Sequence, residues 1–294
     1  MGGHLARPRS VGQGALVPHI IVVGSVNLDL VARVPRLPGP GETVAATGLS
    51  RVPGGKGANQ ALAACRLGAE VALVAAVGDD PVADEALGLL SVGGVDLSGV
   101  RDVAGIPTGH ALITVDDAGE TTIVIAAGAN AALTVHAADV CGADAVLTVL
   151  EVPDAAVAAA VEHTTGFVVL TAAPPRPVAP AVLRRADLVV VNRAEEAALD
   201  GLDVAGAVAV THGADGAVLR RGGREVAWAA PPPVTAVDGT AAGDAFTAAL
   251  TVALLDGASD AGALRFACTA GALAATRAGA QPSLPTFADV EALS

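Results

Sequence analysis

The chain has 294 residues, 52% hydrophobic and 16% charged, a composition that supports a sizeable folded core and excludes a largely disordered protein. Its formal net charge of −13 and pI of about 4.7 argue against a nucleic-acid or anionic-membrane partner. The three cysteines form no CxxC pair and no run of about 18 apolar residues occurs, so we expect a cytoplasmic protein without a disulfide framework, a zinc site or a membrane helix.

The N-terminal residues 1–18 are interrupted by Pro, Gly and Gln and are predicted to form a disordered tail rather than a signal peptide. Residues 19–294 are predicted to form one α/β domain. The run HIIVVG, beginning at His19, predicts a buried strand of a parallel sheet. The segment that follows, up to Val44, is rich in Pro and Gly, which predicts a loop and an edge strand.

Strand and helix signals then alternate along the chain. The Ala-rich segment after Gly57 has helical spacing, EVALVAAVG is typical of a strand, and PVADEALGLLSVGG predicts a helix that ends at its glycines. The same rhythm returns after Asp144, and two Ala-rich helices follow Asp238. This alternation favours a doubly wound, mostly parallel sheet flanked by helices.

The segment HALITV-DDAGE-TTIVI interrupts this rhythm, because two alternating runs joined by a short turn predict an antiparallel hairpin. Residues 108–125, together with residues 31–51, are predicted to form a small β lid. Hydrophobic alternation in the hairpin suggests that the lid pairs with a second copy, so we expect a homodimer.

The segment DGTAAGDAF, beginning at Asp238, carries the strongest chemical signal. Its small residues lead into an Ala-rich helix, and such a helix start presents backbone N–H groups where the helix dipole favours an anion. We predict an anion hole at Ala241, Ala242 and Gly243, with Asp244 as the base that takes a proton from a hydroxyl group. The alternative is that Asp238 or Asp244 only caps the helix.

Further motifs accompany this one in a fixed order: VVGSVNLD, PGETV, GGKGANQA, GDD, AGANAAL, LEVP and TRAGAQPS. With these motifs, the chain from about Ile20 onward resembles the ribokinase-like carbohydrate kinases, the PfkB family. The resemblance implies an ATP-dependent kinase with Mg²⁺ and K⁺ as cofactors. It also implies a pentose substrate, with the 5-hydroxyl of D-ribose as the leading choice.

The resemblance assigns roles to individual residues. The sugar-binding residues that it implies are Asn27, Asp29, Gly54, Gly55, Lys56, Asn59, Glu151 and Asp244. The ATP-binding residues that it implies are Asn192, Thr211, Gly213, Gly216 and Gly243. Asn192 and Glu195 match the motif that helps to hold Mg²⁺, through waters because this ion dehydrates reluctantly. The implied potassium site comprises Asp238, Thr240, Ala275, Ala278, Ala280 and Ser283.

Lys56 is the only lysine of the chain and stands among glycines. We expect its compact ammonium to act near the sugar and the transferred phosphate, where a planar guanidinium is less suited. The alternative is that a single lysine stands here by chance. GGKG is not a Walker A loop, because Gly57 rather than Ser or Thr follows the lysine.

The chain departs from the family pattern in three places. The segment between Glu196 and the strand AVAVT is short, which is expected to uncover part of one sheet face. Thr171 stands where the family typically has an amide, and Gly239 stands where Thr is usual.

Three alternatives remain open. The first is another kinase of the same family, acting on deoxyribose, a ketohexose or a nucleoside. The nucleoside is disfavoured, because the lid has almost no aromatic residues that could stack on a base. The second, outside catalysis, is a sugar-binding homologue impaired by the shortened segment. A dinucleotide-binding protein is disfavoured, because no GxGxxG turn follows the first strand.

Overall fold

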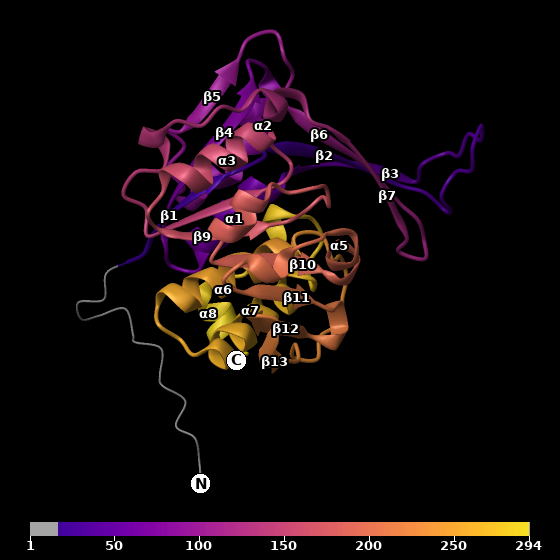
Figure 1. Cartoon of the computed structure of the whole chain (residues 1–294). Coiled ribbons are helices and arrows are strands. Elements are labelled where there is room, and N and C mark those ends of the chain that lie inside the picture. Colours follow the sequence, from indigo (N-terminus) through magenta and orange to yellow (C-terminus); the bar gives the residue numbers. More distant parts are fainter. Residues whose placement is uncertain (1–16, 294) are drawn as a thin grey trace.

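Short runs rich in Val and Leu form the strands of a large central sheet (Figure 1). The computed structural model describes residues 17–293, so residues 1–16 of the predicted tail lie outside the described residues. Within residues 17–293, nine strands are hydrogen-bonded in the order β13-β12-β11-β10-β9-β8-β1-β4-β5. They are β1 (His19–Val23), β4 (Glu70–Gly78), β5 (Val100–Val103), β8 (Ala145–Val149), β9 (Phe167–Thr171), β10 (Leu188–Asn192), β11 (Val208–Thr211), β12 (Ala217–Arg221) and β13 (Arg224–Ala229). The strands from β11 to β5 pair in parallel, whereas β12 and β13 run antiparallel to their neighbours.

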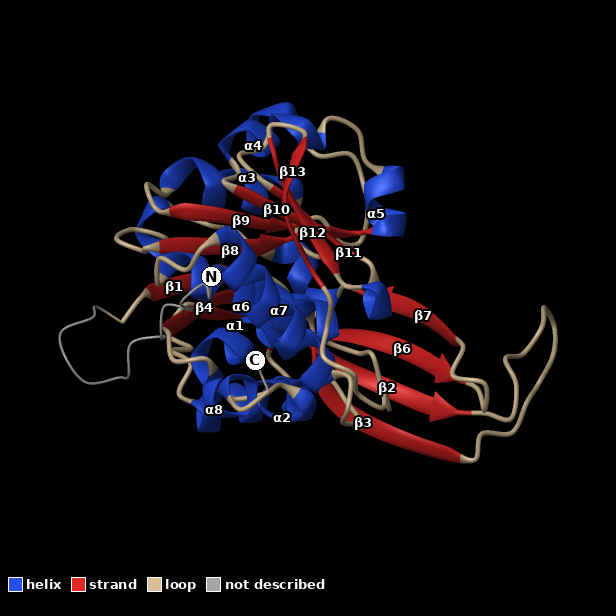
Figure 2. Cartoon of the chain, turned by 90° about the horizontal axis from the view of Figure 1, so that it is seen from below, coloured by secondary structure: helices blue, strands red, loops and turns tan. Residues whose placement is uncertain are grey.

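Helices cover both faces of this sheet, as Figure 2 shows. One face carries α1 (Lys56–Arg66), α2 (Pro81–Gly93), α6 (Ala242–Leu255), α7 (Asp260–Ala274) and α8 (Phe287–Glu291). The other face carries α3 (Asp154–His163) and α4 (Pro180–Arg185), while α5 (Arg193–Ala198) directly follows β10. The 3₁₀ helices are η1 (Gly128–Ala132), η2 (Ala137–Asp139), η3 (Leu202–Val204), η4 (Gly213–Asp215) and η5 (Gln281–Ser283). The predicted doubly wound α/β fold is therefore confirmed.

None of the helices within residues 17–293 combines the length and the apolar character that a bilayer span requires.

A second sheet projects from the side of the molecule (Figures 1 and 2). Its strands are β3 (Gly48–Gly54), β2 (Asn27–Arg33), β6 (Gly109–Val115) and β7 (Thr121–Ala126), in that order across the sheet. We call this sheet the lid. The expectation of an edge strand in the segment up to Val44 is wrong, because β2 pairs with β3 on one side and, in parallel, with β6 on the other.

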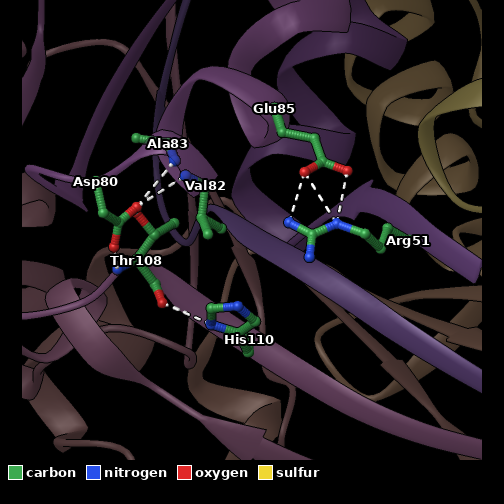
Figure 3. Close-up of polar contacts among 7 residues, drawn as sticks. All are labelled: Arg51, Asp80, Val82, Ala83, Glu85, Thr108 and His110. Atoms are coloured by element: carbon green, nitrogen blue, oxygen red, sulfur yellow. Dashed lines mark hydrogen bonds and ion pairs between the residues drawn. The ribbon is translucent and has the colours of Figure 1, made fainter.

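Two polar contacts fasten the base of the lid to helix α2 (Figure 3). Asp80, the N-cap of α2, accepts hydrogen bonds from the backbone N–H and the hydroxyl of Thr108, both at 2.8 Å, just before β6 begins. Arg51 on β3 pairs with Glu85 on α2, with 2.6 Å between Nη2 and Oε2. The strands on both sides of β2 are thus tied to the same helix.

The shortened segment after Glu196 uncovers less of the sheet than expected. On the affected face, Val208 and Val210 of β11 are buried against a core that includes Leu202. Exposed apolar residues occur in the short segment itself, where Val204 is 50% exposed, and farther out on β13, where Trp228 is 56% exposed. The short segment therefore leaves β10 and β11 covered and affects the sheet edge.

Candidate active site

A cavity of about 990 Å³ lies between the lid and the carboxyl ends of the central strands. Glu151 follows β8, and Thr171, Asn192 and Thr211 end the next three strands, so that one sheet edge places them all around this cavity. The first turn of α6 adds Asp244. Open parallel sheets bind ligands at this edge, outside the carboxyl ends of their strands.

The glycines around Lys56 allow close contacts between backbone segments. A Cβ atom at Gly54 would lie 2.3 Å from Oδ2 of Asp29, and one at Gly57 would lie 2.6 Å from Cα of Gly24. Gly55 has φ of 90°, which side chains rarely tolerate. The start of α1 therefore lies directly against β2 and the loop after β1, and this contact places Lys56 in the cavity wall.

Asp244 is buried at the inner end of the cavity. Its Oδ2 accepts a hydrogen bond from Nδ2 of Asn59 at 2.9 Å, and its Oδ1 accepts one from Nε2 of Gln60 at 3.0 Å. Burial raises the pKa of Asp244, while Lys56 and the two amide donors oppose that rise. The carboxylate is thus held in a fixed orientation with part of its acceptor capacity unused.

The start of α6, where the anion hole is predicted, is not capped by a side chain. Its N-cap is Ala241, which has a left-handed φ of 63° and makes no side-chain cap. The N–H of Ala242 donates to Gly239 within a turn, whereas those of Gly243 and Asp244 donate to no described residue. Of the predicted anion hole, Ala242 thus has its N–H occupied, whereas the N–H groups of Ala241 and Gly243 donate to no described residue. The capping alternative for Asp244 does not describe this helix.

Lys56 stands among four carboxylates, those of Asp29, Glu151, Glu195 and Asp244. Burial alone would lower the pKa of Lys56, but these carboxylates outweigh burial and raise it. Burial, followed by the charges of Glu151 and Asp244, raises the pKa of Asp29 from 3.8 to about 7, and Lys56 opposes the rise. One ammonium therefore offsets a concentration of negative charge.

The predicted sugar-binding residues from distant segments line the same cavity: Asn27, Asp29, Gly55, Lys56, Asn59, Glu151 and Asp244. Gly54 lies behind Asp29 and does not line it. Glu151 is oriented by the hydroxyl of Ser25 and by the backbone N–H of Lys56, which both donate to its Oε2.

The predicted nucleotide residues are only partly brought together. Asn192, Thr211 and Gly243 line the cavity, whereas Gly213 and Gly216 lie in the turn after β11 and do not.

The motif predicted to hold Mg²⁺ begins helix α5. Asn192 and Glu195 form a reciprocal cap, in which Oδ1 of Asn192 accepts from the N–H of Glu195 at 2.9 Å and Oε2 of Glu195 accepts from the N–H of Asn192 at 2.7 Å. The second carboxylate oxygen of Glu195 has no partner among the described residues, and this residue lines the cavity. The pair therefore fits a Mg²⁺ ion held through waters and phosphate oxygens.

Several of the oxygen atoms predicted to bind potassium already accept hydrogen bonds within the protein. The carbonyl of Ala275 accepts two backbone hydrogen bonds, at 2.8 and 3.1 Å, and that of Ala280 accepts from both the N–H and the hydroxyl of Ser283. Both oxygens of Asp238 also accept hydrogen bonds, one of them from Thr240. The carbonyl of Ala278 and the hydroxyl oxygens of Thr240 and Ser283 accept no hydrogen bond from the described residues, so a potassium site here stays a prediction.

Sequence reasoning assigned no role to several polar residues around the site. Asn130 in η1 orients Asn27, because its Nδ2 donates to Oδ1 of Asn27 at 2.8 Å. Gln60 contacts Asp244, and Arg33 lines the cavity from the lid. Asn130 and Gln60 stand inside the motifs AGANAAL and GGKGANQA, so a signal was present for both.

Replacing Asp29 with asparagine is expected to change how stability depends on pH. In the absence of sugar, the folded protein binds the Asp29 proton more tightly than the unfolded chain does, because the pKa is raised to about 7. Ionisation of Asp29 therefore lowers the free energy of unfolding progressively between pH of about 4 and 7, with no further loss above 7. Relative to the unaltered protein, Asp29→Asn should gain about 2–4 kcal/mol across this range in urea unfolding.

Asp80→Asn serves as a control of opposite sign. Burial acts to raise the pKa of Asp80, but hydrogen bonds from Thr108 and from the start of α2 lower it overall. The free energy of unfolding of Asp80→Asn, relative to that of the unaltered protein, should therefore fall as the pH rises toward about 4. A relative stability of Asp29→Asn that stays flat or falls between pH of about 4 and 7 would contradict the raised pKa.

Comparisons with known proteins identify the family of the chain. Residues 17–287 match the family model described as pfkB family carbohydrate kinase. The chain is 35% identical to a ribokinase of Haemophilus influenzae over 91% of this chain and 95% of the relative, and 36% identical to a ribokinase of Bacillus subtilis over 94% and 99%. The solved structure of Arabidopsis thaliana ribokinase complexed with ribose and ATP superposes with a TM-score of 0.85 and 30% identity, covering 95% of this chain and 99% of that one. The chain belongs to the pfkB family of carbohydrate kinases.

Proposed function

We propose that this protein transfers the γ-phosphoryl group of ATP to the 5-hydroxyl of D-ribose. The observation that carries the proposal is the buried carboxylate of Asp244 beside the unoccupied N–H groups that begin α6. A base next to an anion-binding helix start is what phosphoryl transfer to a hydroxyl requires. The similarity to ribokinases over nearly the whole chain supports ribose as the acceptor.

The sugar side of the cavity offers acceptors suited to hydroxyl groups. The carboxylate of Asp29 and the free oxygen of Glu151 face the cavity. Asn59 lines the cavity beside Asp244, to which its Nδ2 donates. We assign these three residues to gripping the sugar with its 5-hydroxyl toward Asp244.

In the reaction, Asp244 takes the proton of the ribose 5-hydroxyl. The hydroxyl oxygen attacks the γ-phosphorus of ATP, and the bond between this phosphorus and the bridging oxygen breaks, so that ADP leaves. The N–H groups of Gly243 and Asp244, with the ammonium of Lys56, stabilise the negative charge on the phosphoryl group in transfer. When bound near Glu195, Mg²⁺ supplies further neutralisation of phosphate charge. The lid excludes water, which limits hydrolysis of ATP.

The exposed lid supports a homodimer. Its exposed apolar side chains are Leu49, Leu112, Ile123, Val124 and Ile125. Ile123 and Ile125 lie on the face that lines the cavity, and Leu112 and Val124 pair on the opposite face. Exposed apolar side chains mark interaction sites, and we assign those of the lid to a contact with a second copy of the chain.

The thiols support a cytoplasmic location. Cys65, Cys141 and Cys268 are all free, as expected in a reducing compartment.

Product analysis on several acceptors tests the proposed function. With Mg-ATP, we expect purified protein to form ADP and ribose 5-phosphate, with a kcat/KM for D-ribose at least about tenfold above those for deoxyribose, fructose and adenosine, since polar contacts to one sugar reject analogues that leave them unpaired. The same assay in KCl and in NaCl measures activation by potassium separately. Tight ribose binding without product would favour the impaired sugar-binding alternative, and a higher kcat/KM on another acceptor would replace ribose.

A further inference from the structure

Gln60 lies in α1 immediately after Asn59, and its side chain is completely buried behind the cavity wall. Nε2 donates two hydrogen bonds, one to Oδ1 of Asp244 and one to Oγ1 of Thr171, each at 3.0 Å. Oε1 has no partner among the described residues. One amide group therefore connects the base on α6 with the end of strand β9.

The Gln60 amide is oriented so that its NH₂ group faces Asp244, while its oxygen is left unpaired. If the group were turned around, Oε1 would face the carboxylate of Asp244, and two acceptors would lie against each other without a donor. A buried acceptor without a partner is unfavourable and rare. The arrangement is consistent with a site in which contact with the base matters more than complete hydrogen bonding of Gln60.

We propose that Gln60 is a positioning residue for phosphoryl transfer, which fixes the plane of the Asp244 carboxylate and ties it to Thr171. The proposal rests on the role of Asp244 as the base. Asn59 holds one carboxylate oxygen and Gln60 the other, so loss of Gln60 leaves the carboxylate free to turn about its bond to Cβ. A proton acceptor displaced by about 1 Å can lose on the order of 10²-fold in rate.

Gln60 also favours the ionised form of the base. Burial raises the pKa of Asp244, and the hydrogen bond from Gln60 counters it together with Lys56 and Asn59. The charged groups that face Asp244 are Lys56 on α1, Glu151 after β8 and Asp29 on β2. These stay in place when Gln60 is replaced, so the loss of one donor should move the pKa of Asp244 upward.

Thr171 supplies the second anchor of the Gln60 amide. Its hydroxyl lines the cavity and accepts from Gln60, at the position where the family pattern has an amide. An asparagine oxygen can accept the same N–H, so either residue can hold Gln60 in place.

The test combines Gln60→Met, which removes both donors at similar volume, with Thr171→Val, Thr171→Ser and Thr171→Asn. We expect Gln60→Met to lower kcat about 10- to 100-fold and to move the acid limb of the kcat–pH profile to higher pH, with the Kd for ribose within about threefold. Thr171→Val should give a smaller loss of the same kind, which Ser or Asn restores. Thr148→Val is the matched control, because Thr148 lies buried on the adjacent strand β8 and its hydroxyl has no partner to lose.

A second readout does not depend on turnover. In the Gln60→Met background, the stabilisation gained by Asp244→Asn, followed by urea unfolding between pH of about 4 and 8, should continue to rise to a higher pH than it does in the unaltered protein. A kcat within twofold, or a lower kcat with both pH profiles unmoved, would overturn the proposal and leave Gln60 with a packing role. Failure of the unaltered protein to phosphorylate ribose would instead count against the proposed function, and the unfolding readout would still decide the role of Gln60.

Discussion

Replacing Asp244 with asparagine is expected to lower kcat by about 10²–10⁴-fold, the range that general bases contribute. The amide has nearly the size of the carboxylate but cannot take the proton of the sugar hydroxyl. Its NH₂ group also meets an N–H of Asn59 or Gln60, both of which donate to the carboxylate. The affinity for ribose should change by no more than a few fold, because the other sugar contacts remain.

Single-turnover kinetics with Mg-ATP and D-ribose, beside calorimetric ribose binding, separate these two effects. Asp256→Asn is the matched control: Asp256 follows the other end of α6, outside the cavity, and burial likewise raises its pKa. This control should keep kcat within about twofold, as expected of a surface change. An Asp244→Asn variant that retains more than a tenth of the original kcat would remove Asp244 from the role of base.

Replacing Lys56 with methionine is expected to lower kcat by about 10²–10³-fold, as the loss of one preorganised charge at a reacting group typically does. Its ammonium offsets the carboxylates of Asp29, Glu151, Glu195 and Asp244. Without it, the pKa values of Asp29 and Asp244 should rise further, because each is now held down by Lys56. The acid limb of the kcat–pH profile should accordingly move to higher pH.

Lys56→Arg separates charge from shape. Arginine keeps the positive charge, so it should restore the position of the pH profile, but its planar guanidinium fits the space beside Gly57 poorly and should restore kcat only in part. Steady-state kinetics across pH check both variants, with thermal unfolding to confirm that each is folded. A Lys56→Met variant with kcat within threefold of the original would mean that this lysine serves neither phosphoryl transfer nor the base.

The alternation of strands and helices could be predicted because long elements such as β4 and α1 carry clear periodicity. Shorter elements escaped: β5, α4 and α8 have four to six residues each, too few for a period to show. The central position of β2 escaped for another reason. It depends on pairing with β6, which lies far along the chain, and no local pattern encodes that partner.

Motifs could predict which residues line the cavity, since each motif lies where a strand or helix meets it. The binding of sugar by these residues stays a prediction. Contacts between side chains could not be predicted from the sequence. Gln60 and Asp244 are 184 positions apart, and only the packing of α1 against α6 brings them together. The potassium ligands stay a prediction, because the sequence does not show which carbonyls, such as that of Ala275, already accept hydrogen bonds.

The two ends of the lid strands have a consequence for acceptor choice. Asn27 is the first residue of β2 and Gly54 is the last of β3, so the segments that carry these two predicted sugar-binding residues continue directly into the lid. Contacts of Asp80 and Arg51 fasten the lid to α2. A substitution far out on the lid can therefore shift Asn27 and Gly54 at its base. Substitutions in the lid can in this way change the acceptor preference while every predicted sugar-binding residue stays the same.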